Sequence, residues 1–308
     1  MSALVTSLLQ STVTMAVPLL LAALGELLAE RAGVINIGLE GMLLTGAFAA
    51  MTATYFSAMP LLGLVAAWFC GLLLAVLFAY VVVVHSANQI VVGTALNLLA
   101  LGITGVAYRA IFGITGAALT VTGFSPVALP FLSSLPVLGP SFFSQTVLGY
   151  FAFALVPLVS LGLYQTIPGL KLRMVGENPG AAAAQGLSVR LTQFLALSGC
   201  GLLAGTAGAY LAIAYAHTFV EGMSAGRGFI ALAIVIFGRW SAWGIGGAAL
   251  LFGLATALQF HVQALGLPIP YQFPLMLPYA LTLLVLAGYA GKTTAPAALG
   301  VPLESELR

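Results

Sequence analysis

The chain has 308 residues, of which 61% are hydrophobic and only 5% are charged, and its formal net charge is +2. Soluble domains carry charge on roughly a quarter of their residues, so this composition excludes a soluble globular protein and indicates an integral membrane protein. Apolar spans of ~20 residues would use up the hydrophobic side chains in roughly nine crossings. We therefore expect a single all-α membrane domain over residues 1–308, built as a polytopic helical bundle. The small net charge gives no reason to expect a nucleic-acid partner.

Apolar segments separated by charged, proline, glycine or amide residues predict the crossings. In chain order they are 5–25, 34–54, 61–84, 90–112, 147–166, 192–214, 226–243, 246–263 and 275–291. The two longest interruptions differ in charge, because 113–146 is proline-rich and uncharged whereas 167–191 is basic. Short loops rich in Lys and Arg stay in the cytoplasm, so 167–191 is predicted to be cytoplasmic and 113–146 extracytoplasmic.

The same rule orients the remaining charges. Counting crossings outward from the 167–191 loop places five further residues on the cytoplasmic side, namely Arg31, His85, Arg239, Lys292 and Arg308. Arg109 and Arg227 fall near the outer ends of spans. Nine crossings put the N-terminus outside and the C-terminus in the cytoplasm.

Two of the predicted spans have unusual composition. The segment 33–46 places Asn36, Glu40 and four glycines where a plain spanning helix would carry Leu and Val, and seven glycines occur in 222–247. Irregular backbone at membrane depth is tolerated only where protein or a wet cavity satisfies its amides. We therefore predict one or two broken helices, and we expect the breaks to line a path through the membrane.

The basic loop contains a short helix signal. Glu177 is followed by Asn178 and Pro179, then by four alanines and Gly186. Asn before Pro is typical of a helix start, since the amide caps free N–H groups and proline at the first position loses no hydrogen bond. Gly186 can end the helix in the left-handed conformation. Because so short a helix is marginal in water, we predict that it docks on a partner.

Polar side chains within spans are candidates for a substrate path, because burying them without a partner costs free energy. Asn36, Glu40 and Asn97 are the best placed. Such amides can also simply join neighbouring helices, and both interpretations remain open. The spacing Gly201–Gly205 indicates close helix packing, within the chain or with a partner chain.

The sequence gives no indication of a catalytic, metal-binding or phosphate-binding site. No His, Cys or carboxylate set has metal-ligand spacing, and Gly288 to Thr293 lacks the spacing of a phosphate-binding loop. We predict no catalytic residue, no metal site and no cofactor in the chain itself.

Four segments together resemble the permease subunits of ABC importers for nucleosides, of the guanosine or general nucleoside type. They are Arg31–Gly41, Gln89–Asn97, Gly176–Gly186 and Gly228–Gly238. The resemblance runs over nearly the whole chain, within the larger group of simple-sugar and branched-chain amino-acid permeases. It implies that Glu177, Asn178, Pro179, Ala183 and Gly186 belong to a coupling helix. If the substrate is a nucleoside, Asn36, Glu40 and Asn97 are the candidates to line its pathway, and Tyr108 and Phe112, toward the outer side, could stack on a base.

The resemblance implies several partners. Two permease subunits form the pathway, so the chain pairs with a related permease, as a heterodimer, or with itself. A separate ATP-binding subunit binds ATP and Mg, and an extracytoplasmic lipoprotein delivers the substrate. The location implied is the bacterial cytoplasmic (inner) membrane.

Two alternatives stay open from the sequence. A simple-sugar ABC permease would share the same motifs. An ion-coupled secondary transporter would use Glu40 or Glu26 to take up a proton or a sodium ion.

Overall fold

The computed structural model describes residues 2–113, 119–264, 270, 272–289 and 295–302, and most of them are helical. The long helices are α1 (Ser2–Arg31), α2 (Leu39–Ser57), α3 (Pro60–Ala79), α4 (Gln89–Phe112), α6 (Val147–Gln165), α9 (Val189–Tyr210), α11 (Ala242–Ala264) and α12 (Gln272–Tyr289). Shorter helices are α5 (Leu138–Phe142), α7 (Ile167–Glu177), α8 (Pro179–Ala184) and α10 (Arg227–Phe237). The π-helical segments η1 (Tyr80–Val84) and η2 (Leu211–Tyr215) extend α3 and α9.

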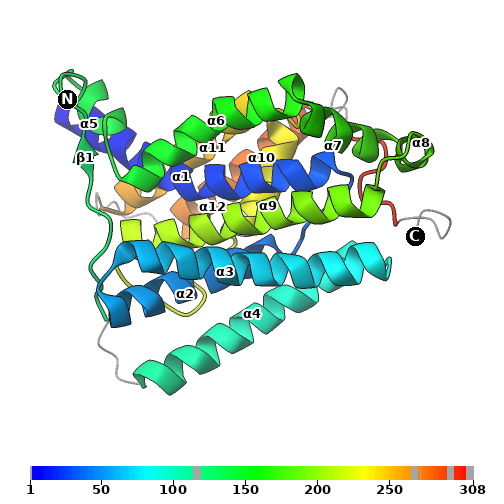
Figure 1. Ribbon diagram of the computed structural model, residues 1–308. Coiled ribbons are helices and arrows are strands. Elements are labelled where there is room, and N and C mark those ends of the chain that lie inside the picture. Colours follow the sequence, from blue (N-terminus) through cyan, green and yellow to red (C-terminus); the bar gives the residue numbers. More distant parts are fainter. Residues whose placement is uncertain (1, 114–118, 265–269, 271, 290–294, 303–308) are drawn as a thin grey trace.

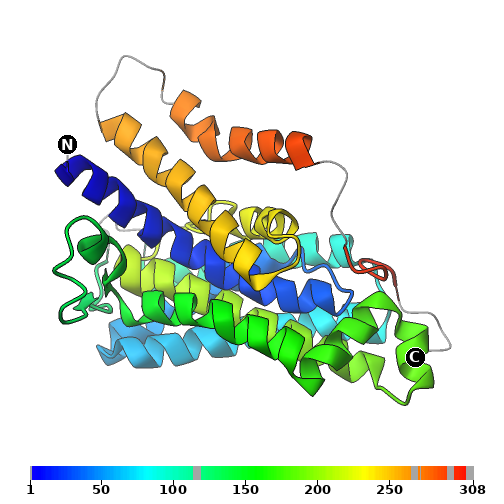
Figure 2. The ribbon, with the colours of Figure 1, turned by 90° about the horizontal axis from the view of Figure 1, so that it is seen from above.

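Helix α1 lies at the centre of the bundle. It packs along α9 on one side and along α11 on the other, while α2 and α3 cover the far side of α9 (Figure 1). Helix α4 lies at an edge of the bundle and contacts mainly α2 (Figure 1), and α12 lies at an edge beside α11 (Figure 2). The central position of α1 explains why its apolar residues are buried all round, as expected for a helix surrounded by protein.

Six helices in the described residues are long and apolar enough to cross a membrane. They are Leu4–Arg31, Pro60–Val84, Gln89–Phe112, Val147–Gln165, Val189–Tyr215 and Ala242–Ala264. The other three predicted spans, 34–54, 226–243 and 275–291, correspond to α2, α10 and α12, which are not among the six. Helix α10 has 11 residues and rises only ~16 Å, too short alone for a hydrocarbon core of ~30 Å. The nine-span count is therefore not confirmed.

The two predicted breaks coincide with irregular backbone. Residues 32–38 are non-helical, although the helix then runs without interruption from Leu39, so the break precedes α2 and does not divide it. Residues 216–226 and 238–241 are non-helical on either side of α10. Both regions thus interrupt helices, and the first is shorter than the predicted segment 33–46.

Close helix packing within the chain accounts for the small residues of α9. A Cβ atom at Gly201 would lie 2.5 Å from the carbonyl oxygen of Gly71 in α3. One at Gly208 would lie 2.1 Å from the carbonyl oxygen of Leu43 in α2. The Gly201–Gly205 spacing therefore serves packing inside this chain.

The two ends of the bundle carry different elements. A short antiparallel ribbon of β1 (Val127–Ala128) and β2 (Ser144–Gln145) lies with α5 near the N-terminal end of α1 (Figure 1). The α7–α8 corner lies at the other end, beside the C-terminal end of α1 (Figure 1). The assignment of 113–146 and 167–191 to opposite sides of the membrane stays a prediction, and residues 114–118 lie outside the described residues.

Candidate functional site

The segment 32–38 folds back along the last turns of α1 instead of leaving the bundle. The backbone N–H of Asn36 donates to Glu26 Oε1 at 2.8 Å, and the N–H of Ile35 donates to Gln89 Oε1 at 2.8 Å. The Asn36 amide nitrogen lies 3.3 Å from Cys200 Sγ, near the middle of α9. Irregular backbone therefore lies inside the bundle, and side chains from α1 and α4 satisfy its N–H groups.

Asn97 of α4 holds the last part of this segment from the other side. Its Oδ1 accepts from the N–H of Gly41 at 2.8 Å, and its Nδ2 donates to the carbonyl oxygen of Ile37 at 2.8 Å. The amide thus pairs with one donor and one acceptor of the backbone at the start of α2. Its polar atoms complete the turn that sets where α2 begins.

Glu40 joins α2 to α10. Its two carboxylate oxygens accept from the N–H groups of Gly226, at 2.7 Å, and Gly228, at 2.6 Å. Gly226 occupies the N-cap position of α10 with φ of 80° and has no side chain to offer. Glu40 therefore supplies the capping oxygens, and its negative charge lies at the positive end of the helix dipole.

We refer to Glu40, Asn97 and the backbone of 36–41 and 224–228 as the α2–α10 junction. Sequence analysis placed Glu40 within one span and Arg227 near the outer end of another. The structure brings them together, because residues 216–226 fold back from the end of α9 into the bundle. The placement of Arg227 near an outer span end is therefore wrong.

A pocket of about 390 Å³ lies at this junction, and we call it the central pocket. Glu40 and Asn97 are both part of its wall, which is otherwise apolar or small. Its other lining residues are Gly41, Leu44, Thr94, Leu98, Leu101, Gly222, Ser224, Ala225 and Phe229. Because Glu40 and Asn97 already bond to backbone groups, the wall offers few strong hydrogen-bonding sites to a guest.

The remaining predicted pathway residues lie elsewhere. Asn36 is fully buried beside Met42 and Cys200 and does not line the central pocket. Tyr108 and Phe112 lie further along α4 in an aromatic cluster, where Tyr108 contacts Phe219 with ring centroids 5.5 Å apart. Their part in a pathway stays a prediction.

Two carboxylates that sequence analysis did not place in the site lie buried at the C-terminal end of α1. Glu26 accepts from the Asn36 N–H, and Cys200 Sγ lies 3.5 Å from its second oxygen. Glu30 accepts a hydrogen bond from the indole of Trp240. Arg31 donates to the carbonyl oxygen of Trp240 at 2.7 Å, so this corner ties α1 to the 238–241 turn.

The α7–α8 corner has the predicted capped helix. Asn178 Oδ1 accepts from the N–H of Ala181 at 2.9 Å, and Pro179 occupies the first helical position. At the other end Gly186 has φ of 78°, and the N–H of Leu187 donates to the carbonyl oxygen of Ala182. The geometry of 178–186 as a short capped helix is therefore confirmed.

Burial shows which face of α8 is available to a partner. Ala182 is buried, Ala183 is half-buried against the core, and Ala181 and Ala184 are exposed together with Glu177 and Asn178. A partner that binds this corner would contact the exposed face. Ala181 and Ala184, more than Ala183, are the alanines that such a partner can reach.

Residues 295–302, the tail segment, connect the corner to the start of the irregular segment. The N–H of Ala298 donates to the carbonyl oxygen of Gly176 at 2.9 Å, and the N–H of Gly300 donates to that of Gly33 at 3.0 Å. Gly176 itself lies against α1, since a Cβ there would be 2.2 Å from the carbonyl oxygen of Arg31. Sequence analysis missed this arrangement, as it missed Gln89 and Trp240, because the partners are far apart in the chain.

Residues 8–286 match the family described as the branched-chain amino acid transport system / permease component. This chain belongs to that permease family. The permease is 38% identical over 301 residues to the guanosine ABC transporter permease protein NupQ of Bacillus subtilis, covering 95% of this chain and 94% of that one. It is 39% identical over 293 residues to the nucleoside ABC transporter permease protein NupC of Lactococcus lactis, covering 92% of each chain.

A third relative carries a different substrate in its name. The putative glucose ABC transporter permease protein TsgC13 of Haloferax volcanii is 39% identical to the permease over 272 residues, covering 87% of this chain and 81% of that one. The three relatives are thus nearly equal in identity. All three are named as ABC transporter permease proteins, and they differ in the solute that their names give.

Proposed function

We propose that this permease is the membrane subunit of an ATP-driven importer for nucleosides. The observation that carries the proposal is the similarity over almost the entire chain to two permeases named for guanosine and for nucleosides. Glucose is the second candidate, because a relative of equal identity is named for it. The chain itself performs no catalysis in this proposal, and a partner ATPase holds the ATP and Mg.

The central pocket serves as part of the substrate path. It lies where two irregular segments meet inside the bundle, and helix breaks mark binding sites in many transporters. Its wall is mostly apolar, and three of its four polar side chains, Glu40, Thr94 and Asn97, are already engaged with backbone groups. Such a wall binds weakly, which suits a path whose substrate is selected by a separate delivery lipoprotein outside the membrane.

A second permease closes the path on its open side. Helix α4 contributes to the central pocket on one face and exposes apolar residues on the other, including Leu99, Ile103 and Val106. We propose that a related permease, as a heterodimer, or a second copy packs beside this helix. In this arrangement nine segments cross or enter the bacterial inner membrane, with α2, α10 and α12 counted, and the C-terminus is cytoplasmic.

Helix α8 receives the motion of the ATPase. Its exposed alanines offer a small surface to a groove, and Gly176 at its base contacts both α1 and the tail segment. The tail segment in turn bonds to Gly33, three residues before Asn36 in the irregular segment. A displacement of α8 would therefore reach the α2–α10 junction through backbone contacts.

The experiment that tests this function is uptake by the complete complex in proteoliposomes. ATP should drive accumulation of labelled guanosine, and excess unlabelled nucleosides should compete while glucose should not. Competition by glucose alone would select the second candidate. Accumulation by this chain without partners, driven by a proton or sodium gradient, would overturn the proposal in favour of a secondary transporter.

The coupling role of α8 is tested by Ala184→Arg. The substitution adds bulk and charge on the exposed face without entering the core. We expect ATP-driven uptake to be lost while the protein still inserts and folds. The control is Gln165→Arg, an exposed position at the end of α6 on the same side of the bundle, which should transport normally. Normal uptake by Ala184→Arg would contradict the docking role.

A further inference from the structure

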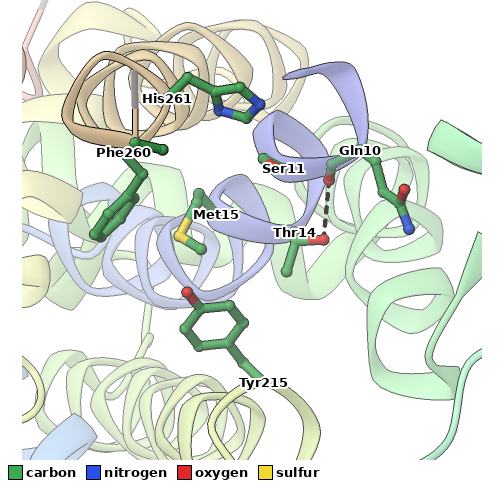
Figure 3. Close-up of a pocket in the computed structure, with 8 residues that line it drawn as sticks. Gln10, Ser11, Thr14, Met15, Tyr215, Phe260 and His261 are labelled. Atoms are coloured by element: carbon green, nitrogen blue, oxygen red, sulfur yellow. Dashed lines mark hydrogen bonds between the residues drawn. The ribbon is translucent and has the colours of Figure 1, made fainter. Parts of the chain in front are cut away.

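A second pocket opens at the end of the bundle opposite the α7–α8 corner, and we call it the outer pocket. Its volume is about 420 Å³, within the range typical of small-molecule sites. Its wall includes Ser11, Thr14 and Met15 of α1, Tyr215 of η2, and Phe260 and His261 of α11 (Figure 3). Polar and aromatic side chains therefore line the same opening.

Helix packing alone does not explain why polar residues of α1 line the outer pocket. Ser11 and Thr14 lie one turn apart on α1, whose later turns are apolar and buried. Polar side chains on membrane helices face protein or water because lipid cannot bond to them. Here they face an open pocket, which indicates that water or a polar guest occupies it.

The ring nitrogens of His261 have distinct roles. Nδ1 lies 2.9 Å from the carbonyl oxygen of Ala257, which can only accept, so Nδ1 carries the proton. Nε2 of the neutral ring is then an acceptor, 3.4 Å from the hydroxyl of Ser7. Thr14 Oγ1 donates to the carbonyl oxygen of Gln10 at 2.9 Å (Figure 3) and also bonds to the Tyr210 hydroxyl, which leaves one of its two lone pairs for a guest. The pocket therefore presents acceptors suited to hydroxyl groups.

Aromatic side chains supply the second chemical feature. Tyr215 and Phe260 are 41% and 44% exposed, so parts of both rings are accessible to a guest. The eight lining residues include no Lys, Arg or Glu, which disfavours phosphorylated or charged guests. A flat heteroaromatic ring with attached hydroxyl groups fits this combination.

The outer pocket and the central pocket are separated by a third pocket. The outer pocket shares the lining residues Met15 and Phe260 with this pocket of about 220 Å³ among α1, α10, α11 and α12. The third pocket shares Ala225 with the central pocket. The three pockets are therefore neighbours between the outer end of α1 and the α2–α10 junction.

We propose that the outer pocket is a binding subsite where an uncharged nucleoside first contacts the permease before it moves to the central pocket. The proposal rests on the proposed function and adds a location and a ligand class to it. Ser11, Thr14 and His261 accept from the ribose hydroxyls, and Tyr215 and Phe260 contact the base.

The test measures protection of a cysteine in the pocket. Ser11→Cys in the complete complex should react with a charged, membrane-impermeant methanethiosulfonate, detected by mass spectrometry. Millimolar adenosine should slow this reaction by about tenfold, as expected for ligand at ten times Kd, whereas glucose and adenosine monophosphate should not. Leu4→Cys, exposed on the same helix outside the pocket, should react without protection.

A second variant pair identifies the base contact. Tyr215→Ala should raise the adenosine concentration for half-protection by about tenfold, because base stacking is lost, and Tyr215→Phe should not. A cysteine at position 11 that does not react, or that reacts equally with and without adenosine, would overturn the proposal. All these measurements use a complex with an inactive ATPase, so they remain readable even if ATP-driven nucleoside uptake fails.

Discussion

Asn178 and Glu40 both cap helices in this permease, and they do so over very different distances in the chain. Asn178 caps α8 by accepting from an N–H three residues away. Glu40 caps α10 by accepting from N–H groups 186 and 188 residues away. The first cap forms wherever the local sequence folds, whereas the second exists only when two halves of the bundle are assembled. A change at Asn178 should therefore affect one corner, and a change at Glu40 should affect the whole pathway.

The largest effect is expected for Glu40→Ala. The N–H groups of Gly226 and Gly228 would lose their acceptor inside the bundle, at about 1–3 kcal/mol for each unpaired group. We expect a clear fall in Tm of the detergent-purified protein and loss of uptake. Glu40→Gln keeps one acceptor oxygen, so its Tm and its uptake should lie between those of Glu40→Ala and those of the unchanged protein. A Tm for Glu40→Ala equal to that of the unchanged protein would show that the long-range cap contributes nothing.

Next in size is Gly176→Ala, at the contact between the α7–α8 corner and α1. The added Cβ would meet the carbonyl oxygen of Arg31 at 2.2 Å, and overpacking of this kind costs about 1–3 kcal/mol. Gly180→Ala is the matched control, because the nearest atom to its Cβ would be 3.5 Å away. Thermal unfolding should separate the two variants. Equal Tm values would mean that the corner does not need its close approach to α1.

Asn97→Leu should have a moderate effect. The N–H of Gly41 and the carbonyl oxygen of Ile37 would both lose a partner, at about 0.5–1.5 kcal/mol for each hydrogen bond. Because these bonds hold the start of α2, both translocation and assembly should decline. Asn97→Asp retains the acceptor for Gly41 and should decline less. Full uptake and unchanged Tm for Asn97→Leu would remove the residue from both roles.

The smallest effect is expected for Asn178→Ala. Loss of an N-cap costs about 1 kcal/mol, and α8 is held at its other end by Gly186 and at its base by the tail segment. Uptake should fall while global Tm changes little, and Asn178→Ser, which can still cap, should recover transport. If Asn178→Ala lowered Tm as much as Glu40→Ala, the contrast between the local and the long-range cap would not hold.

The contrast between local and long-range contacts also decides how much of this structure could be predicted from the sequence. The capped helix at 178–186 and the helices Val147–Gln165 and Gln89–Phe112 could be predicted because their signals lie within a few residues of one another. The irregular segments were located by their glycines and polar residues. Which groups would meet there was not predictable, since Glu40, Asn97 and Gln89 find partners only through the packing of α2, α4 and α10. The tail segment carried no signal at all, because its bonds to Gly33 and Gly176 use backbone atoms.

The central claim is that movement of α8 changes the pathway at the α2–α10 junction. It is tested most directly by spin labels at Leu98→Cys in α4 and Phe229→Cys in α10, both exposed residues that line the central pocket. Cys70 is replaced by Ser, and Cys200 is fully buried and does not react. In the complete complex the distance distribution between the labels should shift when ATP binds, and Ala184→Arg should abolish the shift. An unchanged distribution while the bound ATPase hydrolyses ATP would contradict the account.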